Sequence, residues 1–215
     1  MSTPVDNYCE RLGPGLWAEP LNAATNLVFL LAAWLIWRFA RQRGALTGRI
    51  RLVVALMVAV GIGSGLFHTV ATTLTEWLDI IPILLFQLVF LWLYFRDLMG
   101  LGRVSATLFL AAFLAAALAG ESYAHVMNGS LLYLPTLIIL VFLGAYHYHK
   151  PLAERGILLS AAGVFLVSLA FRTVDDGICE RLPIGTHFMW HILNGLLLYL
   201  VARALVVNAG QANGP

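Results

Sequence analysis

Seven long apolar runs, separated by short polar segments, dominate the chain. They cover roughly residues 20–41, 50–71, 79–96, 103–120, 131–149, 156–174 and 186–207. Each run has about the length, near 20 residues, that a helix needs to cross the hydrocarbon core of a bilayer. The pattern therefore predicts an all-α membrane protein in which seven transmembrane helices form a bundle.

The composition agrees with a lipid environment and excludes several other classes. Hydrophobic residues make up 60% of the 215 residues and charged residues only 11%, and the mean hydropathy is +0.85. An average soluble domain is roughly half apolar and about 25% charged. A net charge of +2 gives no strongly basic surface for a nucleic acid, and two cysteines exclude a disulfide-dense secreted scaffold.

The two ends of the chain are polar. Residues 1–19 carry four charged side chains and lack the apolar stretch of a cleaved signal peptide, so we expect them to form a polar head of the mature protein. Residues 208–215 are small and polar and are expected to be a frayed tail. Because the loops between the runs are short, residues 1–215 are expected to form a single transmembrane domain.

The charges predict an orientation in the membrane. Ten of the thirteen basic residues fall at one end of the predicted bundle: Arg38, Arg41, Arg43, Arg49, Arg51, Arg96, Arg103, Lys150, Arg155 and Arg203. Positive charge concentrates in cytoplasmic loops, so the N-terminus is expected outside and the C-terminus in the cytoplasm. Nine of the eleven acidic residues fall at the outer end, which suits divalent cations and ordinary loop solvation equally well.

Three of the predicted spans carry polar side chains that are costly to place in a membrane. The second span holds Ser64-x3-His68, the third opens with Asp79, and the seventh holds His187-x3-His191. An Asp at a helix centre costs about 2.5 to 3.5 kcal/mol on insertion scales, so such residues are candidates for a functional site. Positions i and i+4 share one helix face, so His187 and His191 can present their imidazoles to one ion.

The direction of the helices places these groups at a similar depth. The second span runs toward the outer end and carries His68 near its finish, whereas the seventh starts at that end with His187 and His191. Three histidines with one open position are a usual arrangement for catalytic Zn²⁺. A buried histidine that bonds a neighbouring helix is the alternative for each residue alone. The combination favours a zinc site with Asp79 beside it.

Oxygen donors gather in the N-terminal segment. Asp6, Asn7, Glu10 and Glu19 lie close in sequence, and calcium takes six to eight oxygen ligands from segments of this kind. The same side chains suit helix capping and loop solvation, and their spacing does not decide between these interpretations. Cys9 and Cys179 both fall on the outer side in the predicted orientation, where an oxidising environment allows a disulfide.

Several strings along the whole chain carry a resemblance to a known family. They are Tyr8-Cys9-Glu10; Glu19-Pro20-Leu21-Asn22 with Asn26; Ser64-x3-His68 with Asp79; Arg172-x2-Asp175-x3-Cys179-Glu180; and His187-x2-Trp190-His191. In combination they resemble the alkaline ceramidase family, part of a seven-span hydrolase superfamily that also holds the progestin and adiponectin receptors. The resemblance implies a zinc-dependent amide hydrolase that acts on N-acyl sphingoid lipids in the membrane.

The resemblance also implies roles for individual residues. Zinc would be bound by His68, His187 and His191, and Cys9 would pair with Cys179. A calcium site would be formed by the N-terminal donors Asp6, Asn7, Tyr8, Glu10 and Glu19. The stretch between Glu10 and Glu19 is shorter than in the eukaryotic pattern and contains Gly13-Pro14-Gly15, so a ligand from this turn cannot be aligned.

These residues predict a mechanism. Zinc lowers the pKa of a bound water to about 7. Asp79 is then placed to take the water proton and pass it to the departing amine, and Ser64 to donate to the carbonyl oxygen. We therefore predict cleavage of a ceramide-like amphiphile into a sphingoid base and a fatty acid, in an active site toward the extracytoplasmic face.

Two other functions agree with the same pattern. A receptor-like or structural bundle could use the metal only to hold helices together, and four protein ligands would favour that role. A haem protein could use two histidines as axial ligands, but an H-x3-H pair on one helix suits a single small ion better.

Overall fold

The computed structural model describes residues 3–13, 15–123 and 126–209, and this part of the chain contains seven helices long and apolar enough to cross a membrane. They are Pro20–Gln42, Gly48–Val70 (α3), Thr73–Leu98, Arg103–Gly120 (α5), Ser130–His149, Ile157–Val174 (α7) and His187–Val207 (α8). The first consists of α1 (Pro20–Thr25) and α2 (Leu27–Gln42). The predicted all-α, seven-span fold is confirmed.

Short helical turns extend or join these spans. The third span is α4 (Thr73–Leu93) followed by the π-helical turn η1 (Tyr94–Leu98), and the fifth is η3 (Ser130–Tyr133) followed by α6 (Leu134–His149). The 3₁₀ turns η2 (Glu121–Tyr123) and η4 (Asp176–Ile178) lie in the connections after α5 and α7.

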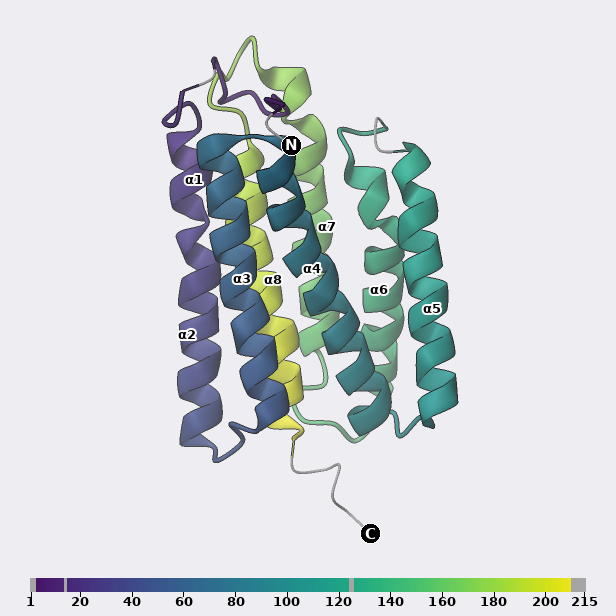
Figure 1. Cartoon of the computed structure of the whole chain (residues 1–215). Helices are drawn as coiled ribbons and strands as arrows, with labels where there is room; N and C mark the ends of the chain where they lie inside the picture. Colours follow the sequence, from purple (N-terminus) through teal and green to yellow (C-terminus); the bar gives the residue numbers. More distant parts are fainter. Residues whose placement is uncertain (1–2, 14, 124–125, 210–215) are drawn as a thin grey trace.

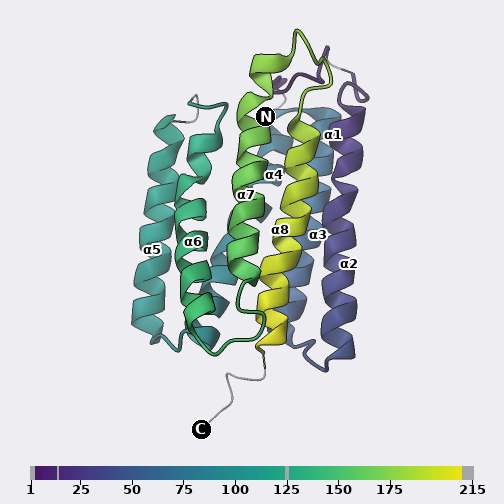
Figure 2. The same cartoon turned by 180° about the vertical axis from the view of Figure 1, so that it is seen from behind.

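The helices run side by side in one bundle (Figure 1), with α5 at its edge beside α6 (Figure 2). The most apolar window of α8 is 56% buried inside the protein, whereas that of α5 is 11% buried. Helix α8 contacts α2, α3, α4 and α7. It is therefore the central helix, and the side chains near its start are surrounded by the other helices.

Two glycines allow close approach of the helices near the site. A Cβ added at Gly63 in α3 would overlap the carbonyl oxygen of Leu78 in α4. A Cβ added at Gly195 in α8 would lie 2.6 Å from a methyl group of Val28 in α2. Small residues are common where membrane helices pack closely. The backbone of α3 thus lies against the backbone of α4, and the backbone of α8 lies against the Val28 side chain of α2.

The third span begins earlier than the apolar pattern predicts. It starts at Thr73, so Asp79 lies inside the helix and not at its first residue. Thr72 caps the helix: its Oγ1 accepts from the Thr75 backbone N–H at 3.4 Å, and the Thr75 hydroxyl oxygen accepts from the Thr72 N–H at 2.9 Å. This capping box uses polar residues, which conceal the first turn from a hydropathy pattern.

Residues 3–13 and 15–19, here called the head, lie over one end of the bundle (Figure 1). The Val5 N–H donates to the carbonyl oxygen of Ala71, between α3 and α4, at 2.9 Å. A disulfide joins Cys9 in the head to Cys179 after η4, across 170 residues of sequence. The head is thus attached to the connections α3–α4 and α7–α8.

Helix α8 ends at Val207, where the seventh apolar run ends, and Asn208 is its C-cap residue. Asn208 is buried, and its Oδ1 accepts from the Ala153 backbone N–H at 2.8 Å. The predicted frayed tail therefore does not include Asn208, and residues 210–215 lie outside the described residues.

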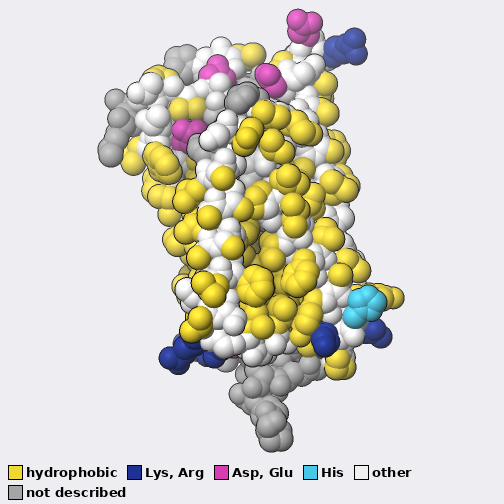
Figure 3. Space-filling model, turned by 90° about the vertical axis from the view of Figure 1, so that its right-hand side faces the viewer, with side chains coloured by type: hydrophobic (Ala, Val, Ile, Leu, Met, Phe, Trp, Pro, Cys, Tyr) yellow, Lys and Arg dark blue, Asp and Glu magenta, His cyan; other side chains and the backbone are white. Residues whose placement is uncertain are grey.

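The two ends of the bundle differ in charge. In the face shown in Figure 3, a broad apolar band separates Asp and Glu side chains at the head end from mostly Lys and Arg side chains at the opposite end. This separation agrees with the pattern from which the orientation is predicted. Which end faces the cytoplasm stays a prediction.

The first testable prediction concerns the disulfide and the orientation together. In intact cells, a membrane-impermeant maleimide should label Cys9 and Cys179 only after treatment with an impermeant reductant, because the bond blocks both thiols and the head is expected outside. Gln42→Cys, at the other end of the bundle in a Cys9→Ser/Cys179→Ser background, should react only in permeabilised cells. Labelling is measured as a mass shift of the purified, denatured protein.

Each part of this prediction has its own contradicting result. Labelling of the wild type before reduction would show that the cysteines are free. Labelling of Gln42→Cys in intact cells would reverse the orientation.

Candidate metal centre

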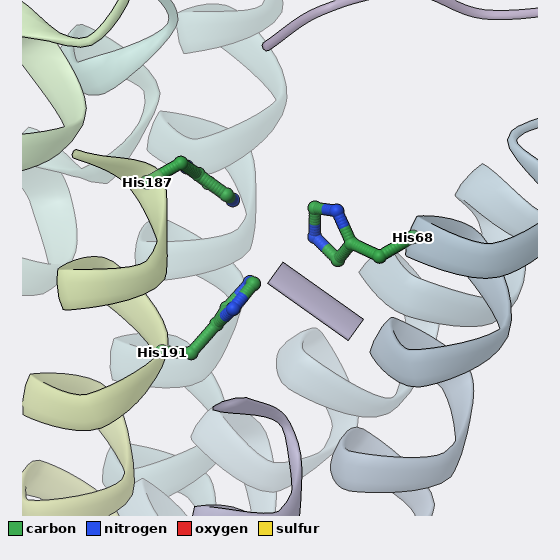
Figure 4. Close-up of side chains that lie close together, drawn as sticks. All are labelled: His68, His187 and His191. Carbon is green, nitrogen blue, oxygen red and sulfur yellow. The ribbon is translucent and has the colours of Figure 1, made fainter. Parts of the chain in front are cut away.

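Three histidine side chains from two helices meet below the head. His68 lies near the end of α3, while His187 and His191 lie in the first two turns of α8, and all three rings point toward a common space (Figure 4). Each residue offers one nitrogen, and these three nitrogens lie within 4.8 Å of one another. Among the described residues, this is the only such group of three or more His, Cys, Asp or Glu side chains.

The three rings leave nitrogens without a hydrogen-bond partner. His68 Nε2, His187 Nδ1 and His191 Nε2 are buried and unpartnered. Leaving a buried polar atom unsatisfied costs about 1 to 3 kcal/mol, so three converging cases need an explanation. A metal ion bound at these nitrogens provides one, and three imidazoles form a donor set typical of Zn²⁺. The residues present therefore fit the predicted zinc.

The other nitrogens of two of the rings have partners that orient them. His68 Nδ1 lies 2.5 Å from Oε2 of Glu19, and His191 Nδ1 lies 2.9 Å from the Thr25 hydroxyl. The Thr25 hydroxyl has two carbonyl acceptors for its proton, Leu21 at 2.9 Å and Asn22 at 3.0 Å, so we assign His191 Nδ1 as the donor to Thr25. Both rings therefore carry their proton on Nδ1 and leave Nε2 free as a ligand.

Tyr8 of the head covers the histidines. Its ring stacks on His187 with the centroids 3.7 Å apart and lies 5.2 Å from the ring of His68. Burial raises the pKa of Tyr8 to about 12, although the nearby Arg172 guanidinium opposes this shift. Nη1 of Arg172 donates to the Tyr8 hydroxyl at 3.3 Å, and the guanidinium also lies 5.2 Å from the ring of Trp190. Tyr8 is therefore a neutral phenol that shields the site from water.

Asp79 and Ser64 lie beside the histidines. Oδ1 of Asp79 is buried without a hydrogen-bond partner. The carboxylate interacts electrostatically with His68, and it accepts a hydrogen bond from the Ser64 hydroxyl. The close contact of Gly63 with Leu78 fixes this part of α4 against α3. An acid with an open oxygen next to a candidate metal is available for proton transfer.

An apolar cavity begins at Ser64 and His191 and continues into the bundle. Its walls come from all seven spans, and they include Phe86, Phe90, Leu140 and Phe165. On α8 the cavity runs from His191 to Val201, which corresponds to about 15 Å at 1.5 Å per residue. The metal centre is thus next to a cavity with mainly apolar walls.

A comparison with models of protein families shows to which family the chain belongs. A family model described as Ceramidase matches residues 5–213, nearly the whole chain. The chain belongs to the Ceramidase family. No curated protein matches it in a sequence search. Membership of the Ceramidase family indicates a membrane-embedded hydrolase that acts on the amide bond of a lipid, ceramide.

In this Ceramidase family member, the sequence alone assigns no role to Asp175. It is fully buried, and its Oδ1 accepts from the backbone N–H groups of Thr186 at 2.5 Å and His187 at 2.9 Å. Its Oδ2 accepts from the Cys9 N–H at 3.3 Å. Asp175 therefore joins the head to the start of α8. Its only signal in the sequence is its place in the Arg172-x2-Asp175 string.

The predicted calcium site is not supported by the structure. Both oxygens of Glu10 accept backbone N–H groups, from Leu21 at 2.7 Å and Asn22 at 2.8 Å, so this carboxylate caps α1. Asp6 and Asn7 are exposed and line an open polar hollow. Among the described residues, the only His, Cys, Asp and Glu side chains grouped closely enough to hold a metal ion are His68, His187 and His191, and no carboxylate of the head belongs to such a group.

Glu19 is likewise engaged with other groups. Its Oε1 accepts from Arg11 Nε at 2.5 Å, and its Oε2 accepts from Asn22 Nδ2 at 3.1 Å as well as from His68. Burial alone would raise the pKa of Glu19, but the hydrogen bonds from His68, Asn22 and Arg11 outweigh it and lower the pKa. Glu19 is therefore an ionised partner of His68 and not an open oxygen ligand.

Glu19 should control metal affinity, whereas Glu10 should not. We expect Glu19→Gln to weaken Zn²⁺ binding by about 10- to 100-fold, because a neutral amide holds the His68 Nδ1–H less well. Glu10→Gln is the matched control: it removes charge from the α1 cap, so it should lower the melting temperature and leave zinc affinity unchanged. Competition with a chromophoric chelator measures both. If Glu19→Gln and Glu10→Gln lost zinc affinity equally, Glu19 would only stabilise the fold and would have no specific role in metal binding.

Proposed function

We propose that this protein is a zinc-dependent intramembrane amide hydrolase that cleaves the N-acyl bond of ceramide-like lipids. The products are a sphingoid base and a fatty acid. The observation that carries the proposal is the set of three buried, unpartnered imidazole nitrogens, one of which belongs to His191 in the wall of an apolar cavity. The family assignment supplies the amide bond of ceramide as the bond that is cut.

We assign the metal ligands to His68 Nε2, His187 Nδ1 and His191 Nε2, the atoms that lack other partners. A zinc ion held there activates water and polarises a carbonyl oxygen. Glu19 and Thr25 hold two of the rings in the tautomers that leave these nitrogens free. Tyr8 and the rest of the head exclude bulk water from the centre, which strengthens electrostatic interactions inside it.

Asp79 is the proposed proton carrier. Its unpartnered oxygen accepts a proton from the attacking water as the bond from the water oxygen to the carbonyl carbon forms. The same carboxyl group then gives the proton to the amide nitrogen as the C–N bond breaks. Ser64, at the mouth of the cavity, donates its hydroxyl proton in a hydrogen bond to the carbonyl oxygen as negative charge develops there.

We assign the aliphatic part of the substrate to this cavity. The acyl chain of a substrate whose amide lies at the histidines would contact the apolar walls along α8 from His191 toward Val201. The walls are mainly aliphatic and aromatic, as expected for a site that recognises a chain by burial of apolar surface. The polar end of the lipid then lies near the head, at the end of the bundle that we predict to be extracytoplasmic.

Purified protein should contain about one zinc per chain, as expected for a single three-histidine site. His68→Ala, His187→Ala and His191→Ala should each lose most of it and all measurable hydrolysis. His149→Ala, at the exposed end of α6, is the control and should keep both. Zinc is measured by elemental analysis and hydrolysis by mass spectrometry of the fatty acid released from an N-acyl sphingoid. Full zinc retention in His191→Ala would contradict the assignment of zinc to these three histidines.

Asp79→Asn should separate chemistry from metal binding. We expect zinc content to remain and turnover to fall by at least about 10², because an amide cannot carry the proton. Glu76→Gln, one turn earlier in α4, serves as a matched loss of one carboxylate and should turn over at close to the wild-type rate. A wild-type rate for Asp79→Asn under single-turnover conditions would exclude Asp79 as the proton carrier.

A further inference from the structure

Arg11 occupies the interior of the head, where a cation is surrounded by oxygen atoms. Its side chain is 4% exposed, and each of its three guanidinium nitrogens has an acceptor. Nε donates to Glu19 Oε1 at 2.5 Å, Nη1 to the Gly13 carbonyl oxygen at 3.3 Å, and Nη2 to the His68 carbonyl oxygen at 3.3 Å. One carboxylate and two carbonyl groups are also the kind of ligands that calcium selects.

The oxygen ligands are thus already in contact with a positive charge. This cation is part of the chain, so it cannot dissociate from the head as a bound ion can. A calcium ion bound at Glu19 would lie beside this guanidinium, whose positive charge would repel it. Both oxygens of Glu10 already accept backbone N–H groups of α1.

Arg11 also acts on the metal centre from two directions. It holds Oε1 of Glu19 while His68 Nδ1 bonds Oε2, so the guanidinium fixes the rotation of the carboxylate that orients the His68 ring. Its bond to the His68 carbonyl oxygen satisfies one of the last four carbonyl groups of α3, which have no partner within the helix. A cation is favourable at this end of a helix.

We propose that Arg11 takes the structural role of a calcium ion in the head, and that it is a positioning residue for His68 through Glu19. This inference rests on the proposed zinc site. It states that the calcium implied by the family resemblance is replaced here by a side chain, so that zinc affinity and stability do not depend on calcium.

The test uses the purified full-length protein in detergent and needs no substrate. Melting temperature and zinc affinity are measured in EGTA and across a calcium titration for the wild type, Arg11→Met, Arg11→Lys and the control Arg181→Met, an exposed residue at the same end. We expect a flat calcium response in the wild type. Arg11→Met should weaken zinc binding about tenfold, as for loss of a partner outside the ligand set. Arg11→Lys should recover most of this affinity and Arg181→Met should match the wild type.

Two results would overturn the proposal. One is a wild-type melting temperature or zinc affinity that rises with calcium, and the other is wild-type zinc affinity in Arg11→Met. If Arg11→Met does not fold, Arg11→Gln takes its place, and the wild-type titration is independent of every variant. A protein that binds zinc without responding to calcium and fails to hydrolyse ceramide would contradict the proposed function and leave the role of Arg11 intact.

Discussion

Three imidazole nitrogens that face one another without hydrogen-bond partners impose the main constraint on this structure. Buried polar atoms are normally satisfied, and the bilayer offers no water to satisfy them. The surrounding structure must therefore hold the rings in place against a tendency to turn toward other partners. Glu19 and Thr25 do this for His68 and His191 through the opposite ring nitrogens. The stacked Tyr8 ring contacts His187.

The head is consequently part of the site and more than a loop that covers it. The partners of the rings come from the segment between residues 8 and 25, whereas the rings themselves are carried by α3 and α8. Asp175 and the Cys9–Cys179 disulfide attach this segment to the start of α8, and Arg11 attaches it to the end of α3. A displacement of the head would change both the orientation of the rings and their exposure to water.

The sequence predicts the parts of this arrangement that depend on periodicity. Seven apolar runs give the seven helices, and the i, i+4 spacing with alternating helix direction brings His68, His187 and His191 to one depth. Partners that meet through tertiary contacts leave no such pattern. Thr25 and His191 are 166 residues apart, and Thr25 sits in an apolar run as an ordinary small residue.

The calcium prediction lacks support for a related reason. Acidic residues near a helix start are equally suited to an ion, to backbone N–H groups and to a basic side chain, and composition does not distinguish among them. Glu10 accepts backbone N–H groups of α1. Glu19 pairs with the basic side chain of Arg11 and also bonds His68. The deciding residue is Arg11, which appears in the sequence as one more charge of a polar head. Its burial shows that the head contains its own cation, and a resemblance based on the acids alone could not reveal this.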